Sequence, residues 1–136
     1  GLTQGGSWHV PLLNQSWNQL WDGVPREFEP VPDLVIYNEG TNDRPDVTAS
    51  FSQMVANIVE ATGGKSTQLL LRPFNGAHAT EIQSVVKSSA AHKVYYGDTT
   101  SFYDGADGLH PFGYNHVGFI APRVAALAAP YLLTAH

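Results

Sequence analysis

The stretch that decides the fold is Pro32-Asp-Leu-Val-Ile-Tyr-Asn-Glu-Gly-Thr-Asn-Asp43. Its continuous apolar centre, residues 34–37, is typical of a strand buried on both faces of a parallel sheet. Gly40 allows the backbone to turn sharply where this strand ends. Asn42 carries a side-chain amide that can donate a hydrogen bond to an oxyanion formed during catalysis. The alternative interpretation is an ordinary Asx turn, in which Asn and Asp are common.

On the C-terminal side of this stretch, helical and strand periods alternate along the chain. Helices are predicted over residues 46–62, 80–90 and 113–133. Strands are predicted over residues 68–74 and 93–97. Asp46 is the expected N-cap of the first helix, and Gly63-Gly64 is its expected stop. This alternation predicts an α/β domain built on a parallel sheet.

On the N-terminal side, residues 1–31 are rich in Gly, Pro, Asn, Gln and Trp, which predicts a loop or lid segment. Its three tryptophans have two interpretations, an aromatic wall beside a substrate or ordinary packing of this segment onto the domain. They are Trp8, Trp17 and Trp21. No linker divides the chain, so residues 1–136 are expected to form a single domain, with residues 32–136 as its α/β core.

Composition excludes several classes of function. The chain has 136 residues, a formal net charge of −5 and no Lys/Arg cluster, so nucleic acid is not an expected partner. It has no cysteine, which excludes disulfides and Cys zinc sites, and no apolar run approaches the ~20 residues of a membrane span. The histidines other than His110 show no ligand spacing, so neither a metal nor another cofactor is expected.

A second chemical motif, Asp107-Gly-Leu-His110-Pro, lies just before the last predicted helix. A histidine can take a proton from a hydroxyl and return it to a leaving group, while a carboxylate orients the ring and stabilises its charged form. Asp107 and His110 therefore fit a base and its orienting partner. The alternative interpretation is that both residues only cap the following helix.

The order and spacing of these two motifs resemble the blocks of SGNH (GDSL-type) hydrolases, over roughly residues 30–134. The resemblance implies a three-layer α/β/α, flavodoxin-like fold with a parallel sheet. It also implies that Asn42 is an oxyanion-hole donor and that Asp107 and His110 belong to a Ser-His-Asp triad. Members of this family are serine esterases and lipases, including many carbohydrate deacetylases.

The family's Gly-Asp-Ser block, which carries the nucleophilic serine, is absent from this sequence. Gly97-Asp98-Thr99 is no substitute, because it follows the wrong strand and offers threonine. The chain is therefore expected to be the C-terminal part of such an enzyme, with its fold incomplete on the N-terminal side. A second oxyanion donor of the family could correspond to Gly1, or to Gly5 or Gly6, although each also suits a plain turn.

The family's first strand lies in the middle of its sheet, so its absence would leave one edge of the Pro32–Gly40 strand uncovered. A preceding segment or a second chain is expected to cover that edge. The expected function is hydrolysis of a carboxylic ester, preferably an acetyl ester of a carbohydrate, by an exported protein, with little activity in this chain alone. The alternative is a non-catalytic carbohydrate-binding domain or a remnant fragment of an esterase scaffold.

Overall fold

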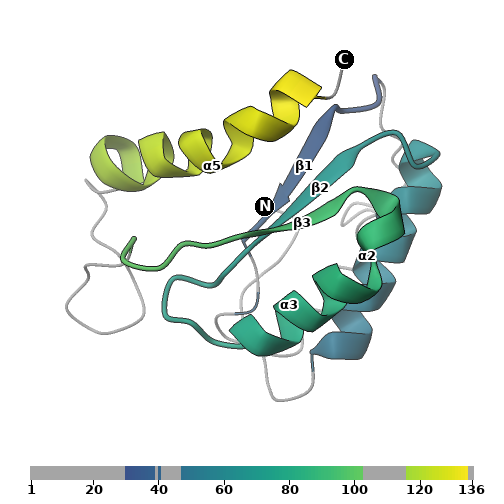
Figure 1. The fold of residues 1–136 in the computed structure, drawn as a ribbon, viewed down its shortest axis with the longest axis horizontal. Coiled ribbons are helices and arrows are strands. Elements are labelled where there is room, and N and C mark those ends of the chain that lie inside the picture. The colour runs from purple at the N-terminus through teal and green to yellow at the C-terminus, as the bar shows by residue number, and fades with distance from the viewer. Residues whose placement is uncertain (1–29, 39, 41–46, 103–115, 135–136) are drawn as a thin grey trace, which may run out of the picture.

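The computed structural model describes residues 30–38, 40, 47–102 and 116–134, and the predicted alternation of helices and strands is confirmed there. The first half comprises β1 (Leu34–Tyr37), α2 (Thr48–Thr62), β2 (Thr67–Leu71) and α3 (Ala79–Ser88). The second half comprises the 3-10 turn η1 (Ala90–His92), β3 (Val94–Gly97), the π-helical turn η2 (His116–Ile120) and α5 (Ala121–Thr134). Figure 1 shows these elements along the chain.

The three strands form a parallel sheet in the order β1-β2-β3, which confirms the predicted parallel α/β architecture. Ile36 lies opposite Leu69 in the first pair, and Leu69 lies opposite Tyr95 in the second. Because neighbouring strands are parallel, the chain must cross from the carboxyl end of one strand back to the amino end of the next. Helices α2 and α3 make these two crossovers.

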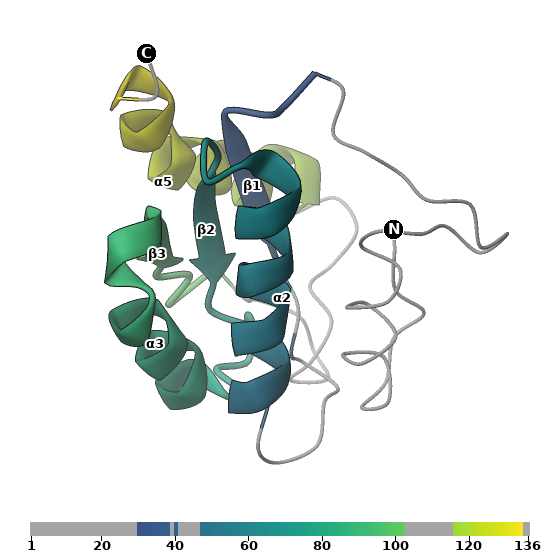
Figure 2. The same cartoon turned by 90° about the vertical axis from the view of Figure 1, so that its right-hand side faces the viewer.

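Helices α2 and α3 cover one face of the sheet, as Figure 2 shows. Apolar residues of α2 that recur at helical spacing point into this core, where Phe51, Met54 and Ile58 are almost fully buried. Ile82 and Val85 of α3 are also fully buried. Each of the two helices therefore packs one apolar face on the sheet.

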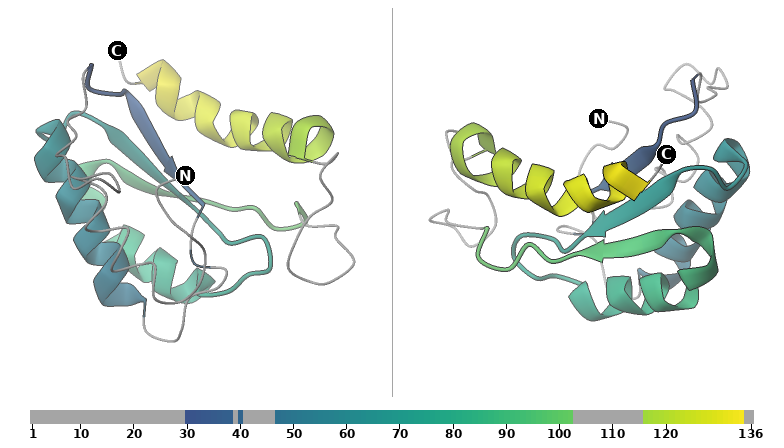
Figure 3. Two further views of the ribbon diagram at one scale, coloured as in Figure 1. Left: turned by 180° about the vertical axis from the view of Figure 1, so that it is seen from behind. Right: turned by 45° about the horizontal axis from the view of Figure 1, so that its top comes forward.

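Helix α5 covers the opposite face of the sheet, so the described part has three layers (Figure 3). Ala128 of α5 is buried against Leu69 and Leu71 of β2. Tyr131 stacks on Tyr95 of β3 with 4.6 Å between the ring centroids. The small second core is thus formed by α5 over β2, with Leu34 of β1 packed against it and Tyr95 of β3 stacked on Tyr131.

Strand β1 differs from the expectation of burial on both faces. Val35 and Tyr37 are buried beneath α2, but Ile36, on the opposite face, is 42% exposed. Within the described residues β1 pairs with β2 alone, and the packed residues of α5 contact mainly β2. A continuous apolar run does not distinguish a central strand from one at the edge of the sheet, which explains the difference.

A buried polar connection crosses the larger core. The Tyr37 hydroxyl donates a hydrogen bond to Gln68 Oε1 at 2.8 Å, and Gln68 Nε2 donates to the Val55 carbonyl at 3.2 Å. Gln68 is fully buried, and burial raises the pKa of the Tyr37 phenol well above its ordinary value. Buried polar groups need such partners, because desolvation without a hydrogen bond is costly. The connection links β1, β2 and α2.

The ends of α2 differ in how they are satisfied. At its C-terminus, Gly63 and Gly64 have positive φ, and Gly64 N–H donates to the Val59 carbonyl at 2.8 Å. The predicted glycine stop is confirmed. At the N-terminus, Val47 occupies the capping position and no side chain caps the helix locally. The predicted cap Asp46 lies outside the described residues.

Candidate active-site edge

The carboxyl ends of the three parallel strands meet at one edge of the sheet, where α2 and α3 begin (Figure 1). In parallel α/β sheets, ligands bind in the loops beyond this edge. The described residues at the edge include Gly40 after β1, Arg72 after β2 and Thr99 after β3. This carboxyl edge is the candidate site, and the two sequence motifs are attached to it through Gly40 and Phe102.

Gly40 is the one predicted site residue inside the described ranges. It is buried and has a φ of 111°, a conformation that side chains other than glycine rarely adopt. A Cβ atom placed there would lie 3.4 Å from Pro73 Cγ and 3.5 Å from Phe51 Cζ. The conformation and the close packing of Gly40 against α2 and the β2–α3 loop therefore both favour glycine at this position.

The ends of β2 and β3 are joined at this edge. Thr99 is fully buried, and its hydroxyl donates a 2.6 Å hydrogen bond to the Arg72 carbonyl. Arg72 N–H in turn donates to the Gly97 carbonyl at 2.9 Å. The Thr99 hydroxyl is thus engaged in holding two strands together, which agrees with the exclusion of Gly97-Asp98-Thr99 as a nucleophile motif.

Two charged side chains near the edge also stabilise local turns. Asp98 Oδ1 accepts hydrogen bonds from the Thr100 hydroxyl at 2.6 Å and from Thr100 N–H at 2.9 Å. These bonds lower the pKa of the Asp98 carboxyl, the hydroxyl bond contributing most. The Arg72 guanidinium donates to the Phe74 carbonyl at 3.2 Å. Both groups serve the loops that follow β2 and β3.

Glu81 connects the beginnings of α2 and α3 at the same edge. Its Oε2 accepts a 2.9 Å hydrogen bond from Val47 N–H, and its Oε1 lies 3.1 Å from His78 Nδ1. The bond with His78, followed by that from Val47, lowers the pKa of the Glu81 carboxyl. A carboxylate from α3 therefore satisfies the backbone N–H of Val47, the residue at the capping position of α2.

The other predicted site residues lie outside the described ranges. They are the catalytic pair Asp107 and His110, the oxyanion donors Asn42 and Gly1, and the aromatic residues Trp8, Trp17 and Trp21. Their roles remain predictions. The described chain nevertheless places Gly40 after β1 and Phe102 after β3, so both motif segments leave from the same edge of the sheet.

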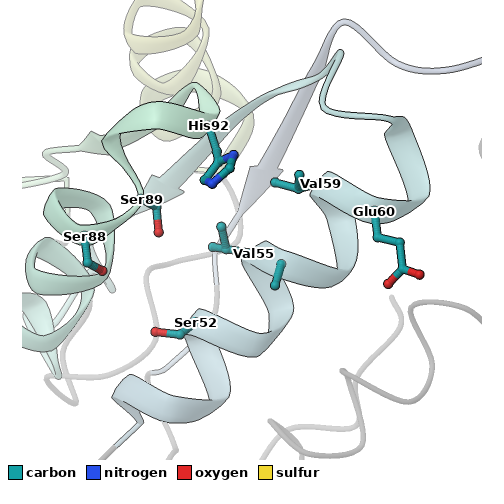
Figure 4. A pocket seen from close by; sticks show the side chains of 8 residues that line it. Ser52, Val55, Val59, Glu60, Ser88, Ser89 and His92 are labelled. Atoms are coloured by element: carbon teal, nitrogen blue, oxygen red, sulfur yellow. The ribbon is translucent and has the colours of Figure 1, made fainter.

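A pocket of about 500 Å³ lies elsewhere, between the outer sides of α2 and α3. Its lining includes Ser52, Val55 and Val59 of α2, together with Ser88, Ser89 and His92 from the chain before β3. Figure 4 shows the His92 imidazole facing α2 across this pocket. The residues before β3 lie at the amino end of that strand, so the pocket lies away from the carboxyl ends of the strands, and Gly40 is not among its described lining residues.

Two further findings apply to the described part of the chain. It contains no group of three or more His, Cys, Asp or Glu side chains placed to hold a metal ion. Among its helices, none has the length and apolar character needed to cross a membrane.

Sequence reasoning did not single out Glu81 or His78 as residues of this edge. Glu81 lies in the first turn of α3, where an acidic residue is common because of the helix dipole. Its bond to Val47 joins residues far apart in the chain, and no local pattern predicts such a contact. The left-handed φ of 56° at His78 was likewise not signalled by a glycine or asparagine.

Comparison of the chain with protein-family models, curated proteins and solved structures gives no significant match.

Proposed function

We propose that this chain is the C-terminal part of an SGNH-type serine ester hydrolase. His110 acts first as general base toward a serine hydroxyl and then as general acid toward the leaving group. Asp107 orients the His110 ring and stabilises its protonated form. Asn42 donates a hydrogen bond to the oxyanion of the tetrahedral intermediate, with Gly1 as a candidate second donor. This reaction requires no cofactor.

The observation that carries the proposal is the common edge from which both motifs leave. Neighbouring strands are ~4.8 Å apart, so the ends of β1 and β3 are separated across β2 by roughly 10 Å. Asn42 follows Gly40 by two residues and His110 follows Phe102 by eight, and each residue spans up to ~3.4 Å. Both segments are long enough to bring their side chains together above the end of β2.

The open side of β1 supports the proposal that the serine comes from outside these residues. In the described part of the chain β1 has a strand neighbour only in β2. Proteins normally cover such an edge, because its backbone groups can pair with another strand. A preceding segment, or a second chain, would pair with β1 and bring the nucleophilic serine to the carboxyl edge.

The proposed substrate is a carbohydrate ester, with acetyl esters preferred. Trp8, Trp17 and Trp21 could supply aromatic faces for a sugar ring or an acyl group. Such a substrate suits an exported protein. The substrate class rests on the family resemblance and the tryptophans, so it is tested separately from the reaction itself.

The location of the serine is tested with a fluorophosphonate probe, which reacts with activated serine hydroxyls. The 136-residue chain and the same chain carrying the segment that precedes it in its source protein are treated with the probe and measured by intact mass. Labelling of the longer protein alone, at a serine before Gly1, is the expected result. Labelling of a serine within residues 1–136 would contradict the proposed division of the triad.

The roles of the residues are tested by hydrolysis of p-nitrophenyl acetate in the longer protein. His110→Ala should lower kcat by at least ~10³-fold, and Asn42→Ala by about 10²-fold. His92→Ala is the matched control, because His92 is exposed and lines the pocket away from the edge. Wild-type rates in His110→Ala would refute the proposal, and sugar binding without turnover would favour a non-catalytic binding domain.

A further inference from the structure

The pocket between α2 and α3 owes its size to small side chains where the two helices face each other. The side chains of packed helices normally interdigitate and leave few voids between them. Here four of the lining residues are serine or alanine, namely Ser52 and Ala56 of α2, Ser88 at the end of α3, and Ser89 directly after it. The volume of about 500 Å³ lies in the range of roughly 300–1,000 Å³ that is typical of small-molecule sites.

Ser89 contributes a buried hydroxyl to this pocket. The residue is 9% exposed, and Figure 4 shows its hydroxyl directed from the end of α3 into the pocket. Ser89 occupies the N-cap position of η1, but its side chain makes no capping hydrogen bond, and no other residue within the described ranges bonds to its hydroxyl. Burial of a hydroxyl without a partner is costly, and most buried side-chain polar atoms have one. The Ser89 hydroxyl therefore calls for a hydrogen-bonding group inside the pocket.

The α2 side of the pocket is apolar. Val55 is 3% exposed, Val59 is partly buried, and Ala56 lies on the same side. Of the described lining residues, Glu60 alone carries a fixed charge, and Figure 4 shows its carboxylate directed away from the other labelled side chains. A charged ligand would lose hydration here without gaining a counter-charge, whereas an apolar group is stabilised by leaving water.

We propose that this pocket binds a small uncharged amphiphile, a compact aliphatic molecule with one hydroxyl or carbonyl group. Its apolar body contacts Val55 and Val59, and its polar group forms a hydrogen bond with the Ser89 hydroxyl. Small-molecule sites commonly combine an apolar lining with a few polar groups that fix the orientation of the ligand. Because the pocket lies away from the carboxyl edge, this site is separate from the proposed ester hydrolysis and does not depend on it.

Binding is tested with cyclohexanol as the probe, added to the isotopically labelled full chain and followed by NMR spectra of the backbone amides. Saturable shift changes should appear at the amides of Ser52, Val59 and Ser89, with the millimolar affinity expected for so small a ligand. Cyclohexanecarboxylate has a similar shape but a negative charge, so it should bind at least ~10-fold more weakly. The proposal is overturned if these amides show no saturation or if cyclohexanecarboxylate binds as tightly. Tighter binding of methyl glucoside than of cyclohexanol would overturn the aliphatic class in favour of a polyol.

The position of the ligand is tested with variants of the lining residues. Ser89→Ala should weaken cyclohexanol binding about 2- to 10-fold, the range for loss of one neutral hydrogen bond. Ser88→Ala is the matched control, because the Ser88 hydroxyl already donates to the Val85 carbonyl at 3.0 Å, and it should change the affinity less than twofold. Ala56→Phe adds a ring at an exposed position of α2 that lines the pocket, so it should abolish saturable binding.

Two outcomes with these variants would contradict the proposal. Unchanged affinity in Ser89→Ala would show that water satisfies the Ser89 hydroxyl and would refute its contact with the ligand. Unchanged affinity in Ala56→Phe would show that cyclohexanol binds elsewhere on the protein. The amide spectra of each variant report in the same experiment whether the fold is retained.

Discussion

The hydrogen bond from Tyr37 to Gln68 should contribute measurably to stability, and Tyr37→Phe tests this directly. The substitution removes one hydroxyl group and leaves the ring in the core. Gln68 Oε1 then loses the donor that lies 2.8 Å away, at a side chain with no solvent exposure. Loss of one partner at a buried polar atom costs about 1–3 kcal/mol, because the remaining group cannot turn to water. We expect the free energy of unfolding to fall by that amount.

The assay is urea unfolding of wild type and variants, followed by circular dichroism. The expected loss corresponds to a decrease of roughly 3–10 °C in Tm for a chain of this size. Tyr95→Phe is the control, because Tyr95 lies in β3 and is 42% exposed, so loss of its hydroxyl should cost less than about 0.5 kcal/mol.

A double-mutant cycle with Gln68→Leu separates the hydrogen bond from general effects of each substitution. Once Gln68 is replaced by an apolar side chain, removal of the Tyr37 hydroxyl should cost much less than it does in wild type. A coupling energy of about 1 kcal/mol or more is expected. A coupling near zero, or an unfolding free energy of Tyr37→Phe equal to that of wild type, would refute the argument.

Three further predictions concern backbone conformation and pH. Gly40→Ala should lower the free energy of unfolding on the order of 2 kcal/mol, and more than Gly63→Ala does. The φ of Gly40 is 111°, whereas Gly63 has a φ of 61° and a Cβ there meets no atom within 4 Å. Urea unfolding of both variants measures the two losses of stability. Above pH 10, the ordinary pKa of tyrosine, stability should fall less steeply in Tyr37→Phe than in wild type. The raised pKa of Tyr37 keeps its phenol protonated in the folded state while the unfolded chain ionises, which increasingly favours unfolding; equal slopes in alkaline titrations would contradict this. The lowered pKa of the Glu81 carboxyl stabilises the fold at pH values above 4.5, the ordinary pKa of this group, and the contribution is lost as the pH falls through the lowered pKa. The Tm of Glu81→Gln should therefore depend less on pH in the acid range than the Tm of wild type. Equal acid profiles of Tm would count against this prediction.

Much of the architecture could be predicted from hydrophobic periodicity. The glycine stop after α2 and the order of helices and strands were predicted correctly for the described residues. These features are local, since they depend on which side chains recur on one face and on which residues accept positive φ. The chemistry of Asn42, Asp107 and His110 was also suggested by short local motifs.

The degree to which β1 is covered could not be predicted in the same way. An apolar run is compatible with a central strand or an edge strand, and the exposure of Ile36 depends on where α5 packs and on which strands pair. The carboxyl edge as a candidate site could be predicted once the strands were known to be parallel. Which groups support that edge could not, because Glu81 and Val47 meet only through the packing of α3 against α2.

The sequence by itself determined the kinds and order of the elements and the residue types available for chemistry, because periodicity, turn glycines and functional groups are properties of short segments. Only the tertiary structure decided that the Glu81 carboxylate accepts from Val47 N–H, that Tyr37 and Gln68 pair in the core, and that β1 has a single strand neighbour among the described residues. These contacts join residues about 30 or more positions apart. Their geometry is set by the packing of helices on the sheet, which no single segment encodes.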